Sequence, residues 1–526
     1  MQKTTVNINE QIIKILLSAK ILNQNRLKKV KNRMANNYKV GIVSNAELLY
    51  TYKHLLKKKK ISAKPEIEHL LKKRAIRTLS GVAPVAVLTK HYKCPGNCAF
   101  CPNEKDMPKS YLSNEPAVMR AILTKFNPYD QVKYRLRALE EHGHQTDKIE
   151  LIIMGGTFSF LPKQYQTWFI RRCFDACNKK TSQSLAQAQK TNERAKHRII
   201  GLTLETRPDY INQKELIRFR QLGCTKIEIG VQAIDNKILE LNQRGDTVEQ
   251  IVKATKLMKQ AGFKVAYHMM PNLPGSTPTK DFKMFEKLFS DENFQPDMLK
   301  IYPTVVTAGT KIYTWWKKGK FKPYSNKQLI TLLIKIKKII PNYVRIIRLI
   351  RDIPEQSILA GNKVSNLRQT LKTQLDEQGV ECQCIRCREA RENITGISKA
   401  KLFIVKYPAS EGTEYFLHYS SPNKKILYAF LRLRLDQKFK HFIPELQDCA
   451  LIREVHTYGK LISLGSKEKA VQHMGFGKKL LLEAEKIAKK NNFDKIAVIS
   501  GIGVRSYYKK NYYKLKGTYM IKTLKK

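Results

Sequence analysis

Short apolar, β-rich runs alternate with longer helical stretches, and this alternation constrains the fold of the 526-residue chain more than any other feature. Six such runs occur, at residues 85–88, 149–154, 199–204, 226–231, 264–269 and 298–302. Strands that alternate with helices form parallel sheets, because each return to the same edge of the sheet needs a crossover connection. We therefore predict an α/β fold, with an open (β/α)6 barrel over residues 76–345.

Glycine and polar residues follow several of these strands. In barrels of this class the functional loops lie at the carboxyl edge of the sheet. Each position alone is explained by ordinary turn chemistry, but four successive strands with such residues favour one shared site. The candidates for cofactor binding at this edge are Gly155, Gly156, Thr157, Glu205, Arg207 and Gln232.

Three cysteines follow the first predicted strand, Cys94, Cys98 and Cys101, at CxxxCxxC spacing. Thiolates are the usual ligands of iron–sulfur clusters, and three of them leave one iron of a four-iron cluster open to a substrate. A structural zinc knuckle, or three unconnected thiols, is the alternative; zinc sites usually show a fourth Cys or His nearby. The motif is similar to the signature of the radical SAM superfamily, which implies a [4Fe-4S] cluster that chelates S-adenosyl-L-methionine.

A second cysteine group lies in residues 346–400, a predicted linker. Cys382, Cys384 and Cys387 place three thiols within six residues, a spacing more typical of structural zinc than of chance. No fourth ligand is obvious from the sequence. An auxiliary iron–sulfur cluster and unmetallated thiols remain alternatives.

The last segment, residues 401–526, is predicted to be a separate α/β domain. Gln472, Gly475 and Gly477 form a QxxGxG pattern before an amphipathic helix, and glycines that open a helix leave N–H groups able to hold a pyrophosphate. The pattern alone is moderately specific. Together with a strand on each side and Tyr508 downstream, it resembles the GNAT acetyltransferase fold, which binds acetyl-CoA.

The chain is strongly basic, with 98 Lys and Arg against 44 Asp and Glu, a formal charge of +54. Residues 1–80 hold 19 basic and 4 acidic side chains, and residues 1–75 read as basic amphipathic helices. Such a region fits nucleic acid, although a lysine-rich genomic bias explains part of the excess. No signal peptide or membrane span is predicted, and clustered cysteines favour a reducing, cytoplasmic location.

A radical SAM barrel joined to a GNAT domain resembles the catalytic subunit of Elongator and its single-chain bacterial and archaeal relatives. The resemblance covers nearly the whole chain. It is carried by residues 77–82, 154–158, 204–210, 228–232, 268–271, 300–304, 351–354, 453–456, 472–477 and 500–505.

The resemblance implies carboxymethylation at the fifth carbon of the wobble uridine, uridine 34, in tRNA. In the implied mechanism, a 5′-deoxyadenosyl radical from SAM abstracts hydrogen from the acetyl methyl of acetyl-CoA, and the carbon radical adds to uridine. Cys94, Cys98 and Cys101 would hold the cluster, and Lys148 and Tyr508 are further catalytic candidates. The implied acetyl-CoA contacts are Lys148, Glu454, Val455, His456, Thr457, Phe476, Gly477, Lys478 and Tyr508.

The spacing of both cysteine groups is similar to that of prokaryotic relatives. It implies a stand-alone enzyme that meets the anticodon stem-loop of tRNA and an electron donor, without the other Elongator subunits of eukaryotes. One alternative is a protein lysine N-acetyltransferase in which the radical SAM-like domain is only structural. Another is a tRNA-binding protein without turnover.

Overall fold

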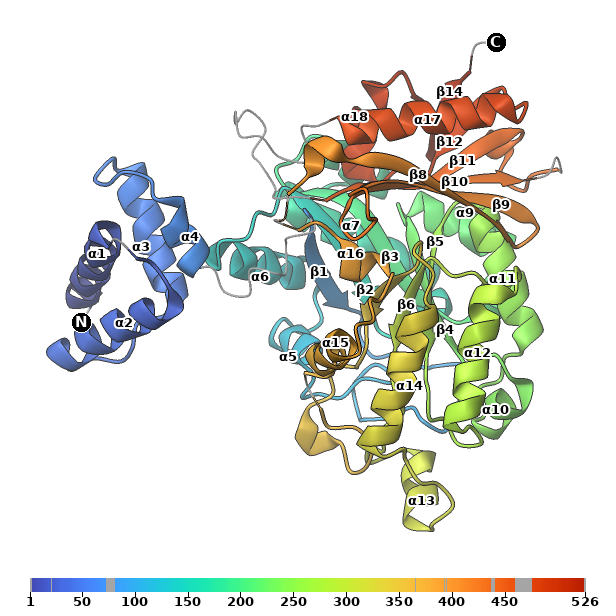
Figure 1. The fold of residues 1–526 in the computed structure, drawn as a ribbon, viewed down its shortest axis with the longest axis horizontal. Helices are drawn as coiled ribbons and strands as arrows, with labels where there is room; N and C mark the ends of the chain where they lie inside the picture. The colour runs from blue at the N-terminus through green and yellow to red at the C-terminus, as the bar shows by residue number, and fades with distance from the viewer. Residues whose placement is uncertain are drawn as a thin grey trace.

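The computed structural model describes residues 2–19, 21–71, 81–364, 366–391, 393, 395–436, 440–458 and 475–524. It has a helical module at the N-terminus, a parallel sheet wrapped by helices, and a second sheet with its own helices (Figure 1). The helical module stands apart from the two sheets, which lie against each other (Figure 1).

The sequence predicts helices in the N-terminal module, and its described residues form four of them. Side chains cap two of them: Asn23 accepts from the backbone at the start of α2, and Ser44 and Glu47 form a capping box on α3. The module buries its own hydrophobic core, separate from that of the two sheets. The helices are α1 (Gln2–Ser18), α2 (Gln24–Tyr38), α3 (Asn45–Lys57) and α4 (Pro65–Leu71).

The first sheet has seven parallel strands in sequence order, and their alternation with helices confirms the predicted half-barrel. The strands are β1 (Ala83–Leu88), β2 (Lys148–Met154), β3 (Arg198–Thr206), β4 (Lys226–Gln232), β5 (Lys264–Met269), β6 (Met298–Ile301) and β7 (Arg345–Arg348). The prediction of six units was wrong by one strand. β7 was missed because only Ile346 and Ile347 lie between its two arginines, too short an apolar run to read as a strand.

Helices connect these strands along the chain. They are α5 (Pro116–Leu123), α6 (Pro128–Glu141), α7 (Lys163–Asn178), α8 (Leu185–Asn192), α9 (Gln213–Gln221), α10 (Asn236–Leu241), α11 (Val248–Gln260), α12 (Pro278–Ser290), α13 (Lys311–Lys317) and α14 (Asn326–Ile339). Two further helices, α15 (Leu367–Glu377) and α16 (Ile385–Arg388), lie between the half-barrel and the second sheet in the chain. None of the described helices combines the length and apolarity that a membrane crossing requires.

The second sheet is mixed, with the strand order β13-β14-β12-β11-β10-β9-β8. Only β11 and β12 pair in parallel. Its elements are β8 (Lys401–Ala409), β9 (Gly412–Ser420), β10 (Leu427–Asp436), β11 (Cys449–Thr457), α17 (Phe476–Lys490), β12 (Lys495–Val498), α18 (Arg505–Lys509), β13 (Lys514–Lys516) and β14 (Tyr519–Thr523).

The two sheets share one continuous hydrophobic core, which contains residues of both. At their contact, Arg453 of β11 donates to both carboxylate oxygens of Asp297, at 2.9 and 2.5 Å, and to Glu414 at 3.1 Å. All three side chains are fully buried. Buried ion pairs are costly to break, so this contact fixes the second domain on the half-barrel.

Candidate active site

The cysteine triad lies on the loop after β1. The loop is fixed on both sides of Ala99: its N–H donates to the carbonyl oxygen of Asn242 at 2.9 Å, and its carbonyl oxygen accepts from the N–H of Ile312 at 3.1 Å. Cys98 is buried, whereas Cys94 and Cys101 are partly exposed. Three thiols on one anchored loop, open on one side, form a fitting donor set for a cluster with one free iron.

Two guanidinium groups surround the Cys98 thiol. Arg207 and Arg244 donate to its Sγ at 3.8 and 3.6 Å. Asp209 holds Arg207 through two hydrogen bonds, at 2.9 and 3.1 Å. Asp246 lies fully buried behind Arg244, 3.2 Å away, and burial raises the pKa of its carboxyl to about 6. The site therefore presents positive charge to a cysteine-bound cluster.

The glycine loop after β2 lies beside the triad. Gly155 and Gly156 have φ values of 132° and 92°, and a Cβ at Gly155 would lie 2.0 Å from Oγ1 of Thr89. Only glycine fits this close approach. Thr157 places its Oγ1 4.0 Å from Sγ of Cys94. The backbone of this loop is therefore brought close to the predicted cluster.

Charged side chains of alternating sign fill the interior of the half-barrel. Lys226 contacts Glu150 at 2.5 Å and Glu228 at 3.5 Å, and Lys300 contacts Glu228 and, at 3.4 Å, Glu205. Tyr111 donates to Glu205 at 2.8 Å. Barrels of this kind are usually filled by branched apolar residues. This polar interior suits a polar substrate.

Burial and the neighbouring charges shift the pKa values of Glu228 and of His268, which lies beside it. Burial opposes the ionisation of Glu228, but the ammonium groups of Lys300 and Lys226 outweigh it and hold its pKa well below the usual range. Burial, together with Lys300, lowers the pKa of His268. Glu205, Glu228 and His268 come close enough together to bind a metal ion, but Lys300 already supplies a cation to both carboxylates.

One cavity of about 1790 Å³ joins the cysteine end of the half-barrel to the second domain. At the cysteine end it is lined by Cys94, Cys98, Cys101, Gly156, Thr157, Glu205, Arg207 and Gln232. At the other end it is lined by Lys148, Glu454, Val455, His456, Thr457, Gly475, Gly477, Lys478 and Tyr508. The structure thus brings most of the predicted site residues to a single cavity.

Two of the predicted cofactor-binding residues that the structure describes, Gly155 and Phe476, do not line that cavity. Gly155 packs on Thr89, as described above. Phe476 is buried at the start of α17, where its ring lies 4.6 Å from that of Tyr419. Gln472 lies outside the described residues.

At the second-domain end, Lys148 and Tyr508 face the cavity from different domains. Burial lowers the pKa of the Lys148 ammonium and raises that of the Tyr508 hydroxyl. Burial also lowers the pKa of His456 to about 4, and its ring lies 4.4 Å from that of Tyr458. Gly475 opens α17 with a φ of 70° and without a side-chain cap, which leaves backbone N–H groups for a ligand.

The second cysteine group forms a separate cluster. The Sγ atoms of Cys382, Cys384 and Cys387 lie within 4.8 Å of one another. Hydrogen bonds from Cys382 and Cys384 lower the pKa of Cys387, and Lys337 lies 3.6 Å from its Sγ. Among the described residues, no fourth His, Cys, Asp or Glu joins them.

Sequence reasoning missed Arg244 and Lys300. Arg244 reaches Cys98 across 146 positions, and Lys300 reaches Glu205 across 95. A signal for the charged interior was present in β4, where Lys226 and Glu228 alternate with isoleucines. Residues two apart on a strand share a face, so this spacing places both charges inside.

The chain matches two family models and several characterised proteins. The radical SAM superfamily model matches residues 89–288, and the radical SAM C-terminal domain model matches residues 296–377. The tRNA uridine(34) acetyltransferase of Methanocaldococcus infernus is 45% identical over 98% of this chain and 98% of its own length. That of Dehalococcoides mccartyi is 43% identical over 86% of this chain and its full length.

The chain belongs to the tRNA uridine(34) acetyltransferase family. Human Elongator complex protein 3, another relative, is 39% identical over 86% of both chains. A solved structure of the archaeal Methanocaldococcus infernus Elp3, with an N-terminal deletion of residues 1–46, covers 84% of this chain at a TM-score of 0.74 and 43% identity. As a radical SAM family member, the chain has the superfamily's requirement for SAM and a [4Fe-4S] cluster.

Proposed function

We propose that this chain is a tRNA-modifying enzyme that carboxymethylates the fifth carbon of uridine 34, with SAM and acetyl-CoA as co-substrates. One observation carries the proposal: a single cavity joins the cysteine triad to the glycine-opened helix α17 in a chain 45% identical to a tRNA uridine(34) acetyltransferase. An acyl donor bound at one end can therefore reach a radical generated at the other.

The half-barrel supplies the radical chemistry. Cys94, Cys98 and Cys101 would hold the cluster, which when bound supplies the electron that releases a 5′-deoxyadenosyl radical from SAM. Arg207 and Arg244 would orient the Cys98 side chain and balance the negative charge of its thiolate. The backbone at Gly156 and Thr157 would bind the polar groups of SAM together with Glu205 and Gln232, which line the same cavity.

The second domain supplies the acyl donor. Its mixed sheet with α17 behind Gly475 supports a GNAT-like acetyl-CoA domain, in which the free N–H groups at Gly477 and Lys478 hold the pyrophosphate. Glu454, Val455, His456 and Thr457 of β11 would line the acyl end, and Gln472 is a further proposed acetyl-CoA contact. Tyr508 and Lys148, which line the cavity from the two domains, would contact the CoA group.

Cys382, Cys384 and Cys387 support a structural zinc site, because their three thiols converge on one point.

The chain would then have four parts. These are a basic tRNA-binding module at 1–75, the radical SAM barrel at 76–345, the zinc-binding linker at 346–400 and the acetyl-CoA domain at 401–526. The basic module would contact the tRNA anticodon stem-loop. The proposed reaction also needs an electron donor to reduce the cluster. It would not need the other subunits of eukaryotic Elongator.

The test is mass spectrometry of tRNA nucleosides after incubation with the reduced enzyme, SAM and acetyl-CoA. Carboxymethyluridine is expected from the native chain and none from Cys98→Ser. If the cluster is intact and no carboxymethyluridine forms, the proposal is wrong.

A protein lysine N-acetyltransferase would instead yield acetyl-lysine that survives Cys98→Ser. A tRNA-binding protein without turnover would bind tRNA but neither SAM nor acetyl-CoA.

A further inference from the structure

A basic and aromatic surface lies on α13 and the loop after it. Residues 298–351 contain no Asp or Glu and thirteen Lys or Arg, so a general excess of lysine does not account for the composition. Two of the three tryptophans of the chain are adjacent there, Trp315 and Trp316. We define the α13 surface as Tyr313, Trp316, Lys317, Lys318, Lys320 and Lys322.

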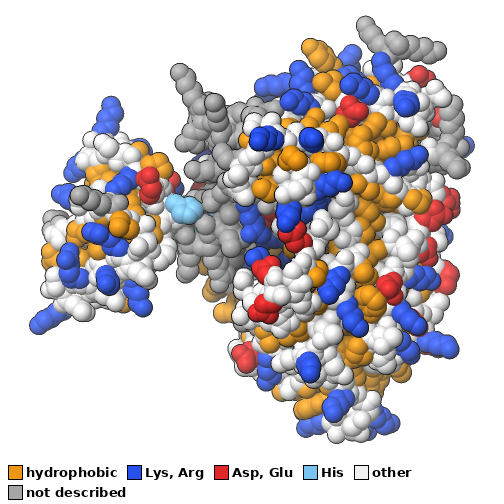
Figure 2. Space-filling view, in the orientation of Figure 1, with side chains coloured by type: hydrophobic (Ala, Val, Ile, Leu, Met, Phe, Trp, Pro, Cys, Tyr) orange, Lys and Arg blue, Asp and Glu red, His pale blue; other side chains and the backbone are white. Residues whose placement is uncertain are grey.

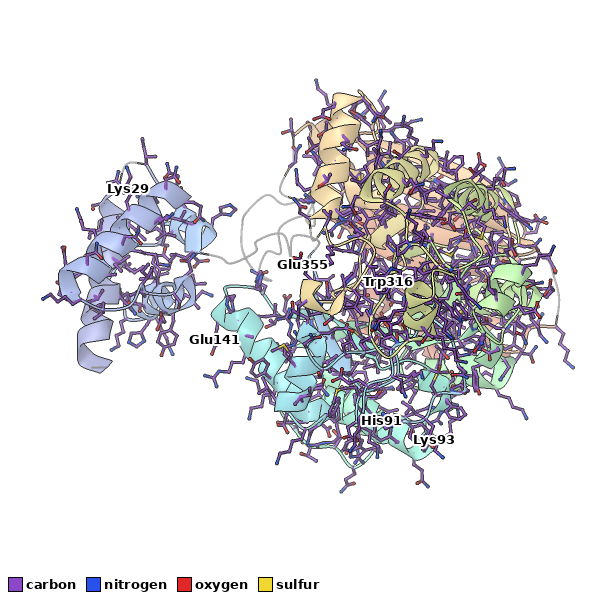
Figure 3. The ribbon with its side chains drawn as sticks, turned by 90° about the horizontal axis from the view of Figure 1, so that it is seen from below. Lys29, His91, Lys93, Glu141, Trp316 and Glu355 are labelled. Atoms are coloured by element: carbon purple, nitrogen blue, oxygen red, sulfur yellow. The ribbon has the colours of Figure 1, made fainter. Side chains whose placement is uncertain are left out.

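The side chains of the α13 surface are available to a partner. The four lysines are exposed, and Tyr313 and Trp316 are half-buried. The two rings lie 6.1 Å apart, and the ammonium of Lys317 lies 5.1 Å from the centre of the Tyr313 ring. α13 lies at the end of the molecule opposite α17 and β14 (Figure 1), where blue and orange side chains lie side by side in the space-filling view (Figure 2). Trp316 belongs to the main body rather than the helical module (Figure 3).

This surface adjoins the cysteine triad. Ile312 of α13 donates its N–H to the carbonyl oxygen of Ala99, which lies between Cys98 and Cys101. Ile312 and Ala99 belong to one small hydrophobic cluster, and the rings of Tyr313 and Trp316 pack against it. The α13 surface therefore lies next to the loop that carries the triad, outside the cavity, where it can contact a macromolecule bound at that end of the half-barrel.

The residue types indicate the partner. Half-exposed rings stack on unpaired bases, and lysines beside them neutralise phosphates, which is how single-stranded nucleic acid is bound without sequence readout. An acidic protein would use the lysines but not the rings. We propose that the α13 surface binds the unpaired nucleotides that flank the target uridine in the anticodon loop. The inference rests on the proposed function and assigns the loop contact to the catalytic half-barrel, separate from the N-terminal module.

The first test neutralises the four lysines. The variant K317Q/K318Q/K320Q/K322Q is compared with K489Q/K490Q/K514Q/K516Q, which changes four exposed lysines of the second domain. The probe is a synthetic anticodon stem-loop RNA with uridine at the wobble position. We expect about tenfold weaker binding by the first variant, with a salt-dependence slope lower by up to about 2.8, since each of the four lysines contributes about 0.7 when it contacts a single-strand phosphate. The control variant is expected to bind as the native chain does.

The second test separates stacking from packing. Trp316→Leu keeps an apolar side chain over the hydrophobic cluster, whereas Trp316→Phe keeps a ring. We expect Trp316→Leu to bind the stem-loop about fivefold more weakly, and Trp316→Phe to bind nearly as well as the native chain. Equal loss in both variants, or loss in neither, would contradict stacking.

The outcomes separate this inference from the proposed function. If the native chain makes no carboxymethyluridine, the proposed function fails. If it makes the product, and the four-lysine variant binds the stem-loop with unchanged affinity and slope, only the present inference fails. It also fails if that variant keeps its RNA affinity and its dithionite-driven turnover but loses turnover with a flavodoxin-type reductant, since the surface would then dock an electron donor.

Discussion

At the scale of single residues, the surroundings of Cys98 distinguish it from the other two cysteines of the triad. Two guanidinium groups converge on its Sγ, and each is held from behind by a carboxylate, Asp209 for Arg207 and Asp246 for Arg244. Hydrogen bonds to cluster sulfurs help to set the reduction potential. Arg244 should therefore tune the cluster as well as hold its ligand.

We expect Arg244→Met to shift the cluster's reduction potential to more negative values, because the reduced, more negative state loses a nearby positive charge. Arg244→Lys, which keeps the charge, should shift it less. The measurement is a redox titration followed by electron paramagnetic resonance. Arg137→Met, at an exposed arginine paired only with Glu141, is the control. An unchanged potential in Arg244→Met would show that the contact only positions the loop.

The triad could be predicted from sequence because its three ligands lie within eight positions. Arg244 and Lys300 could not, since their partners, Cys98 and Glu205, lie far away in the chain. At the second-domain end, the predicted residues were found through a local glycine pattern and the family resemblance. Contacts within a loop are encoded locally, whereas contacts across the barrel depend on the assembled sheet.

At the scale of elements, the charged interior contributed by β3, β4 and β6 makes Glu228 a sensitive position. We expect Glu228→Gln to lower the free energy of unfolding at neutral pH by about 3 kcal/mol, because it removes the buried carboxylate that Lys300 and Lys226 share and leaves each lysine with one carboxylate, Glu205 or Glu150. Urea-induced unfolding followed by circular dichroism measures this. Asp376→Ala, which breaks an exposed pair with Lys372, should cost about 0.5 kcal/mol or less.

The difference in the free energy of unfolding between the native chain and Glu228→Gln should depend on pH. Because the folded-state pKa of Glu228 lies below its ordinary value of 4.5, its ionisation adds stability above pH 4.5. That contribution is lost as the pH falls from 4.5 toward the folded-state pKa. The stability gap between the native chain and Glu228→Gln should therefore narrow below pH 4.5. A gap that widened on acidification would contradict the ion-pair assignment.

The linker cysteines make a separate prediction. We expect Cys387→Ser to lose one equivalent of zinc in elemental analysis, since only two thiols would remain. Cys449→Ser, at a partly exposed thiol far along the chain from this group, should retain it. Equal metal content in the two variants would argue against zinc at this group.

Six of the seven strands of the half-barrel could be predicted from the sequence, and β7 could not. Buried parallel strands read as continuous apolar runs, which is the signal that β2 and β5 carry. β7 presents only two apolar residues, and its pairing with β6 fixes it as a strand. Tertiary pairing thus overrides a weak local pattern.

At the scale of the whole molecule, the N-terminal helices form a module with its own core. A variant that begins at Gly81 should therefore keep the melting temperature of the remaining domains and its rate of SAM cleavage. Its affinity for full-length tRNA should fall, with a smaller salt dependence, because many positive charges are removed. Filter binding at several salt concentrations measures this. Unchanged affinity would place tRNA recognition elsewhere, and a lower melting temperature would show that the module is part of the main fold.

The shared core and the Asp297–Arg453–Glu414 contact also determine where this protein can be recombined with its relatives. A chimera with its junction between the half-barrel and the second domain would split one hydrophobic core, and could leave a buried charge without its partner. Exchange of the N-terminal helices, with a junction between residues 71 and 81, breaks neither. Gene shuffling should therefore yield functional hybrids at the junction between residues 71 and 81, and insoluble ones at the junction between the half-barrel and the second domain.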